Sequence, residues 1–226
     1  MEHELLFLPQ SKTKPLWCWM AFKYLLLPQM VSYVLGVVCS DAVVNFVYHL
    51  LSVLGVSLIS GDYLPCAFRR AAAHPKRCLW VCALSLALYF AAAWGLGSLI
   101  VCLEPAFANR NNETILLLRR EGLLLTALFT VFLAPLSEEC LFRGLLFGQV
   151  LKKSRMGAYA LSAVCFALIH VMGYLGTYTP LQLVLSLAQY LPAGLILARS
   201  FEKSGTIAVP ILIHMTINAI SMVQIL

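Results

Sequence analysis

Long apolar runs separated by short polar segments make up most of the chain. Most of these runs approach or exceed the roughly 20 residues that a helix needs to cross a bilayer. They cover, in order, about residues 17–39, 42–60, 79–103, 122–151, 157–172, 180–198 and 207–226. The pattern predicts an all-α, polytopic membrane protein with about seven transmembrane helices, which form a single transmembrane domain over residues 1–226.

Three features modify this simple pattern. Pro28 lies within the first run and predicts a kink there. The fourth run, 122–151, is longer than one span, so its helix should be tilted, broken near Pro135, or extended beyond the bilayer. Of the polar segments, we expect 62–77 to lie partly on the membrane as a short amphipathic helix, and 104–121 to be a loop.

Composition excludes a soluble globular protein, because 61% of the residues are hydrophobic and only 12% are charged. The net charge of +6 does not indicate a nucleic-acid partner, since the basic residues lie in short clusters between apolar runs. The eight cysteines occur singly, without the spacing of a zinc site or a disulfide scaffold. We therefore expect the lipid bilayer as surroundings and most cysteines as small core residues.

The basic residues also predict the orientation in the membrane. With the N-terminus in the cytoplasm, twelve of the sixteen lysines and arginines fall on cytoplasmic segments, and Arg143 lies within a span. The twelve are Lys12, Lys14, Lys23, Arg69, Arg70, Lys76, Arg77, Lys152, Lys153, Arg155, Arg199 and Lys203, against Arg110, Arg119 and Arg120 outside. Cytoplasmic segments are enriched in Lys and Arg, so a cytoplasmic N-terminus is favoured.

The fourth run contains three ionisable side chains, Glu138, Glu139 and Arg143. A charge near the centre of a bilayer costs on the order of 3 kcal/mol on insertion scales, so three charges together predict a functional site. Glu139 and Arg143 are four residues apart, the spacing at which an acid and a base meet on one helix face. Adjacent Glu138 is turned about 100° away, which leaves it free for chemistry.

Polar residues on two later runs lie at a similar depth. Glu138 lies 14 residues before Lys152 and His170 lies 13 after Gly157, which gives about 20 Å from the cytoplasmic end for both. His214 and Asn218 lie nearby in depth and share one helix face, four residues apart. We expect Glu138 and His170 to hold and deprotonate a water, and His214 and Asn218 to stabilise an oxyanion. The arrangement predicts hydrolysis of an amide bond.

The same residues resemble the motifs of a known family. Glu138-Glu139-x-x-x-Arg143, Phe166-x-x-x-His170 and His214-x-x-x-Asn218 occur in this order on separate apolar runs. They are similar to the three motifs of the CAAX protease and bacteriocin-processing family of glutamate-type intramembrane proteases, also called the Abi family. The resemblance covers roughly residues 125–220, within a protease core of about 122–226.

The resemblance implies the same roles for four residues: Glu138 and His170 activate water, and His214 and Asn218 form an oxyanion hole. Glu139 and Arg143 would hold the site together without a cofactor, and Phe166 is expected to pack beside them. The eukaryotic members that trim prenylated proteins typically have an additional span, so the chain looks more like the bacterial branch. This implies a multi-pass protein of the bacterial plasma membrane that cleaves a membrane-embedded or membrane-associated peptide or protein.

Other functions fit parts of this pattern. His170, His214 and a glutamate could hold zinc in a metalloprotease, although the chain has no His-Glu-x-x-His run. The polar cluster could also belong to a transporter, or to a non-catalytic immunity or adaptor protein. Asn45 and His49 on the second run are interpreted as packing or gating residues. Substrates such as signalling peptides or prenylated tails would be compatible with a site opening towards the cytoplasmic half.

Overall fold

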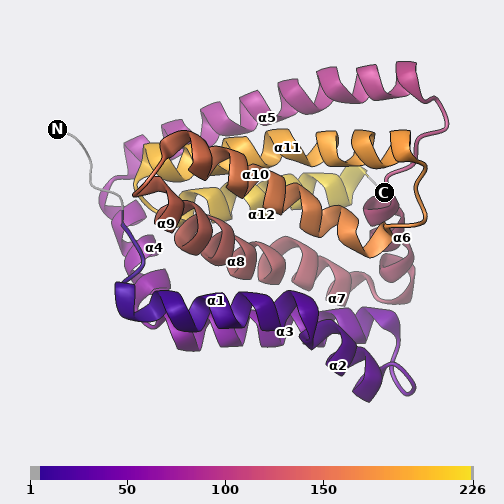
Figure 1. The fold of residues 1–226 in the computed structure, drawn as a ribbon, viewed down its shortest axis with the longest axis horizontal. Helices are drawn as coiled ribbons and strands as arrows, with labels where there is room; N and C mark the ends of the chain where they lie inside the picture. Colours follow the sequence, from indigo (N-terminus) through magenta and orange to yellow (C-terminus); the bar gives the residue numbers. More distant parts are fainter. Residues whose placement is uncertain (1–5, 225–226) are drawn as a thin grey trace.

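The computed structural model describes residues 6–224, and within this range the chain forms helices and no strand. In order, the elements are α1 (Gln10–Leu25), α2 (Leu27–Leu35), α3 (Asp41–Ser60), α4 (Tyr63–Ala73), α5 (Pro75–Leu103), α6 (Arg110–Glu121), α7 (Leu123–Ala127), the π-helix η1 (Leu128–Leu133), α8 (Ala134–Glu139), the π-helix η2 (Cys140–Phe147), α9 (Gly148–Leu151), α10 (Arg155–Val171), the 3-10 helix η3 (Met172–Tyr174), α11 (Pro180–Ser204) and α12 (Ala208–Gln224). Figure 1 shows the long helices lying beside one another along a common direction.

The predicted all-α, polytopic membrane fold is confirmed. Five helices in the described part of the chain are long and apolar enough to cross a membrane. They are Asp41–Ser60, Pro75–Leu103, Leu123–Leu151, Arg155–Tyr174 and Pro180–Ser204. A shorter apolar helix, Ala208–Val223, corresponds to the last predicted run. The first run instead forms the two short helices α1 and α2.

Pro28 explains why the first run is divided. Helix α1 ends at Leu25, and α2 begins at Leu27 with Pro28 in its first turn. Proline lacks a backbone N–H and its ring clashes with the preceding turn of a helix. It therefore fits in the first turn of a helix and disrupts the interior of one. The predicted kink is present as a one-residue interruption at Leu26 between the two helices.

The fourth run forms one continuous helical stretch of 29 residues, so the predicted break near Pro135 is absent, and a tilted helix or one that extends beyond the bilayer stays a prediction. Two π-helical segments, η1 and η2, interrupt its α-helical geometry. The proline ring would clash with the carbonyl four residues earlier, and the wider turn of η1 provides space at that point. A π-helical turn therefore accommodates Pro135 without ending the helix.

This long helical stretch lies at the centre of the bundle. In the most apolar part of this stretch, half of the residues are buried inside the protein. In the most apolar part of α5, only 6% are buried. Figure 1 shows α7, α8 and α9 crossing between α1 and α3 on one side and α10, α11 and α12 on the other. All residues from Ser137 to Gly148 are buried. The charges on this helix therefore lie inside the protein, away from lipid.

The polar segments contain more helix than expected. The segment 62–77 contains the predicted helix, α4. The segment 104–121 is not only a loop, since its second part forms α6. The side chain of Asn109 caps α6 by accepting a hydrogen bond from the backbone N–H of Asn112, and Glu113 lies in the first turn. These capping residues explain why a polar segment became helical.

Helices α10 and α11 pack closely at Gly194. A Cβ atom at Gly194 would lie 2.7 Å from the Cα of Ala163, so only glycine fits without a shift of one helix. Helix α11 continues past the predicted end of its run to Ser204, and Gly205 ends it in the left-handed conformation at φ 80°. Arg199 and Lys203 therefore lie on the last turns of α11.

The close contact at Gly194 gives a stability prediction. We expect Gly194→Ala to destabilise the protein by about 1–3 kcal/mol, because the added methyl group must push the backbone of Ala163 away. Thermal unfolding in detergent micelles would measure this loss. Gly97→Ala is the matched control, since a Cβ there meets nothing within 4 Å and alanine favours a helix. Equal unfolding temperatures for both variants would contradict the predicted contact.

Candidate active site

The four predicted catalytic residues line one cavity. Its volume is about 730 Å³, and Glu138 from α8, His170 from α10, and His214 and Asn218 from α12 all contribute to its wall. These residues are far apart in the chain, so the fold brings the three motifs together as their depths predict. The remaining predicted residues, Glu139, Arg143 and Phe166, lie behind this wall and do not line the cavity.

Glu139 is the centre of a buried ionic cluster. Its Oε1 atom lies 2.8 Å from Nη1 of Arg143, as the four-residue spacing predicts. The same oxygen lies 2.8 Å from Nδ1 of His214, which was not predicted. The side chains of Glu139 and Arg143 are fully buried. Glu139 therefore joins the centre of the long helix to α12.

Arg143 extends this cluster to two more helices. Its Nη2 atom donates a hydrogen bond of 3.1 Å to the backbone carbonyl of Gly194 in α11. Its guanidinium lies over the ring of Phe166 in α10, 4.5 Å from the ring centroid. The ring of Phe166 also contacts the rings of His170 and His214, at centroid distances of 4.6 and 5.6 Å. Phe166 thus holds both histidines and the arginine by packing, as expected.

Glu138 differs from its neighbour because its side chain lines the cavity, whereas that of Glu139 does not, although Oε2 of Glu139 is also buried without a hydrogen bond. Glu138 is buried apart from an exposed fraction of 7% and faces the cavity. Its Oε2 atom is buried, and no residue between 6 and 224 offers it a hydrogen bond. Buried polar atoms in proteins are nearly always hydrogen-bonded, so an unpaired carboxylate oxygen in a cavity marks a place for water or substrate.

The ring of His170 is held in one orientation. Its Nδ1 atom lies 2.8 Å from the backbone carbonyl of Phe166. A carbonyl oxygen only accepts, so Nδ1 carries the hydrogen and Nε2 of the neutral ring is an acceptor. Tyr190 stacks on the ring with a centroid distance of 4.5 Å and an interplanar angle of 23°. The free nitrogen is therefore suited to orient a water molecule.

Asn218 is also held in position. Its side-chain amide donates a hydrogen bond of 2.8 Å to the backbone carbonyl of Thr130 in the π-helix η1. An amide group has two hydrogens, so one remains for another acceptor. The π-helical turn before Pro135 therefore also helps to fix the amide at the cavity wall.

Lys23 is a site residue that the sequence analysis missed. It was counted among the cytoplasmic basic residues, and this is wrong, because its side chain is fully buried in the bundle. Its Nζ atom donates hydrogen bonds to Oγ of Ser137, at 3.0 Å, and to the hydroxyl of Tyr24, at 3.2 Å. Lys23 and three histidines act electrostatically on Glu138. A lone lysine inside an apolar run was the available signal.

His49 is another neighbour of Glu138 that received little weight. It lines the cavity together with Asn45 and Tyr48 from α3. Its ring stacks on Phe129 with a centroid distance of 5.2 Å and an interplanar angle of 2°. The packing role predicted for His49 is present, and the residue also contributes to the cavity wall.

The cavity extends in one direction from the motif residues. Beyond His214 and Asn218, α12 contributes Ser221 and Met222, and the loop before α6 contributes Asn109. These residues lie towards the C-terminal end of α12, away from the basic clusters at the start of that helix. The cavity therefore extends away from the basic clusters, a direction that the estimated depths of the motif residues did not show.

A zinc centre would need several ligand side chains close together. Among residues 6–224, no group of three or more His, Cys, Asp or Glu side chains is placed to hold a metal ion. Nδ1 of His214 faces Glu139 and Nδ1 of His170 faces a carbonyl, so only Nε2 of each ring is left for another partner. The described residues therefore do not fit a His/Glu zinc centre.

The ionic cluster predicts that replacing Arg143 costs much more stability than replacing an arginine at the surface. We expect Arg143→Met to cost about 3–5 kcal/mol of stability, because Glu139 would remain buried without its cation. Thermal unfolding of the purified protein measures this cost. Arg155→Met is the matched control: it removes an ion pair with Glu202, but the Arg155 side chain is 66% exposed, so the change should be small. Similar losses for both variants would contradict the role of the buried cluster.

Comparison with known families agrees with the geometry. Residues 120–220 match the family model described as Type II CAAX prenyl endopeptidase Rce1-like. No curated protein and no solved structure was found to match the chain. The matched range contains all seven predicted site residues, and the family indicates a hydrolase of the CAAX intramembrane protease kind. The part of the chain that carries the site, residues 120–220, is therefore similar to the Rce1-like type II CAAX prenyl endopeptidases.

Proposed function

We propose that the chain is a glutamic intramembrane endopeptidase that hydrolyses a peptide bond of a membrane-associated protein or peptide. The observation that carries this proposal is the unpaired Oε2 atom of Glu138 in a cavity that is also lined by two oriented imidazoles. A carboxylate in this position can remove a proton from water. The assignment to the bacterial branch and to a bacterial plasma membrane stays a prediction.

The first step would be the activation of a water molecule. Glu138 accepts one proton from the water, while Nε2 of His170 accepts a hydrogen bond from the other hydrogen. The oxygen then attacks the carbonyl carbon of the substrate. Because His170 is fixed by Phe166 and Tyr190, the water would be oriented without further ordering of the site.

The second step would be the collapse of the tetrahedral intermediate. The free amide hydrogen of Asn218 can donate to the oxyanion. His214 already directs Nδ1 to Glu139, so donation from Nε2 requires the doubly protonated ring, which the carboxylate of Glu139 would stabilise. Glu138 then returns its proton to the leaving nitrogen as the C–N bond breaks, giving a carboxylic acid and an amine.

The proposed base is tested by replacing its carboxylate. We expect Glu138→Gln to lower the rate of cleavage by about 10²–10⁴-fold while the protein still folds, because an amide cannot accept the proton. The measurement compares membrane peptidomes of cells that carry the native protein or the variant, followed by cleavage of the identified peptide by both purified proteins.

Two controls make this test specific. Glu202→Gln removes a carboxylate that pairs with Arg155 away from the cavity, and it should leave cleavage unchanged. Thermal unfolding of the Glu138→Gln variant separates loss of chemistry from loss of fold. Full activity of folded Glu138→Gln protein would show that Glu138 is not the base.

Removal of metal ions provides an independent test. Because the described histidines and glutamates do not form a metal centre, we expect cleavage by the purified protein to persist after dialysis against a strong chelator. The rate before and after dialysis is the measurement. Activity that disappears with chelation and returns with zinc would replace the proposed mechanism by a metal-dependent one.

A further inference from the structure

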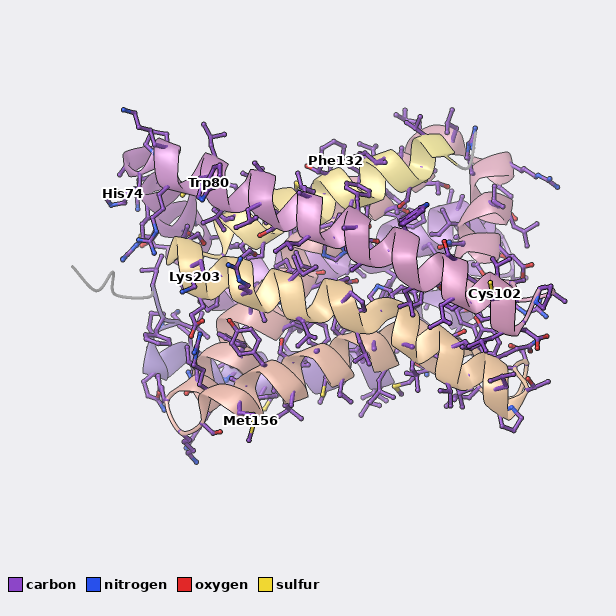
Figure 2. The ribbon with its side chains drawn as sticks, turned by 90° about the horizontal axis from the view of Figure 1, so that it is seen from above. His74, Trp80, Cys102, Phe132, Met156 and Lys203 are labelled. Atoms are coloured by element: carbon purple, nitrogen blue, oxygen red, sulfur yellow. The ribbon has the colours of Figure 1, made fainter. Side chains whose placement is uncertain are left out.

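The two ends of the helical bundle carry very different charge. Figure 2 shows His74, Met156 and Lys203 at one end and Cys102 at the other. Near the first end lie eleven of the sixteen lysines and arginines, whereas three lie near the second and two are buried in the bundle. The eleven are Lys12, Lys14, Arg69, Arg70, Lys76, Arg77, Lys152, Lys153, Arg155, Arg199 and Lys203. We call the first end the basic end and the other the α6 end, after the helix that lies there (Figure 1).

The cavity lies between Glu138 and the α6 end. Helix α3 contributes only residues from its first half, 41–49, and α5 only residues from its second half, 89–96. Both of these halves are at the α6 end, because α3 starts there and α5 ends there (Figure 1). None of the lysines or arginines between residues 6 and 224 lines the cavity. Glu138 and His170 therefore lie at the inner limit of a cavity that avoids the basic end.

Several uncharged polar groups lie on the rim of this cavity at the α6 end, beside the charged Asp41 and apolar residues. Asn109, Asn111, Asn112 and Gln189 line it, together with Tyr174. Each side-chain amide offers both donors and an acceptor, which are the groups that an extended peptide backbone needs to form hydrogen bonds. A lipid acyl or prenyl chain could not use these groups. The rim chemistry therefore fits a polypeptide segment.

Several hydrogen bonds hold the rim in place. The hydroxyl of Tyr174 donates to Oγ1 of Thr114 at 3.0 Å, and that of Tyr190 donates to Oδ1 of Asn109 at 3.1 Å. The backbone N–H of Arg110 donates to the hydroxyl of Tyr178 at 2.8 Å. These contacts connect α6 and its preceding loop to the segment between α10 and α11 and to α11 itself. The rim is thus built as a fixed surface around the cavity.

We propose that substrate reaches the site from the non-cytoplasmic side of the membrane. Basic segments remain in the cytoplasm, which places the basic end inside and the α6 end, with the amide rim, outside. The substrate class would then be exported peptides, or extended segments of membrane proteins that lie at the outer surface. This inference rests on the proposed protease function, but the side on which the cavity opens can be measured without catalysis.

The test uses two single-cysteine additions in the full-length protein. Asn112→Cys lies on the exposed rim, and Lys153→Cys lies at the exposed basic end. Cells expressing either variant are treated with a membrane-impermeant maleimide, before or after permeabilisation, and mass spectrometry identifies the labelled peptide. Locating the label in this way allows the eight native cysteines to remain.

The proposal expects Asn112→Cys to be labelled in intact cells as fully as after permeabilisation, and Lys153→Cys to be labelled only after permeabilisation. The exposed native Cys102 at the α6 end should follow Asn112→Cys, and it gives the same information if that variant does not fold. The reverse pattern, or labelling of the α6 end only after permeabilisation, would overturn the proposal. Repeating the labelling with Glu138→Gln keeps this result separate from any failure of the protease hypothesis.

Discussion

The buried contact of Glu139 with Arg143 and His214 is the interaction on which the rest of the site depends. One carboxylate oxygen holds a guanidinium from its own helix and an imidazole from α12, both at 2.8 Å. Arg143 in turn reaches the carbonyl of Gly194 in α11 and the ring of Phe166 in α10. Four helices therefore meet at this buried ion pair. An arrangement of this kind specifies their register as well as stabilising their contact.

The two adjacent glutamates show how one helix can separate support from chemistry. Their side chains are turned about 100° from each other, so only one can face the ionic cluster. Oε1 of Glu139 is paired there, whereas Glu138 faces the cavity; each carboxylate keeps one oxygen without a hydrogen bond, but only that of Glu138 belongs to a cavity-lining residue. The cost of burying an incompletely paired carboxylate is tolerated because the surrounding helices are fixed by its neighbour.

Local spacing predicted a large part of this arrangement, and long-range contacts supplied the rest. The pair of Glu139 and Arg143 follows from a separation of four residues on one helix, and the common depth of the motifs follows from counting along each span. The contact between His214 and Glu139 depends on how α12 packs, which spacing within a single helix does not determine. The burial of Lys23 was missed for a related reason: charge counting assigned it to the membrane surface, whereas α1 packs it against Ser137. Similarly, the direction of the cavity arises from segments far apart in the chain, whereas the cap of α6 is local, since Asn109 accepts from the backbone N–H of Asn112.

The buried charges also explain how such a site can lie within a membrane protein. Two carboxylates, Glu138 and Glu139, share the interior with two cations, Lys23 and Arg143. With neutral histidines the cluster has no net charge, which lowers the cost of its burial. Moving a proton from water to Glu138 creates a hydroxide while it neutralises the carboxylate, so the net charge stays the same. The oxyanion that follows also carries a single negative charge. These steps move charge within the site, and the one additional charge in the proposed reaction is the second proton on His214 that donation to the oxyanion requires, which the carboxylate of Glu139 would stabilise.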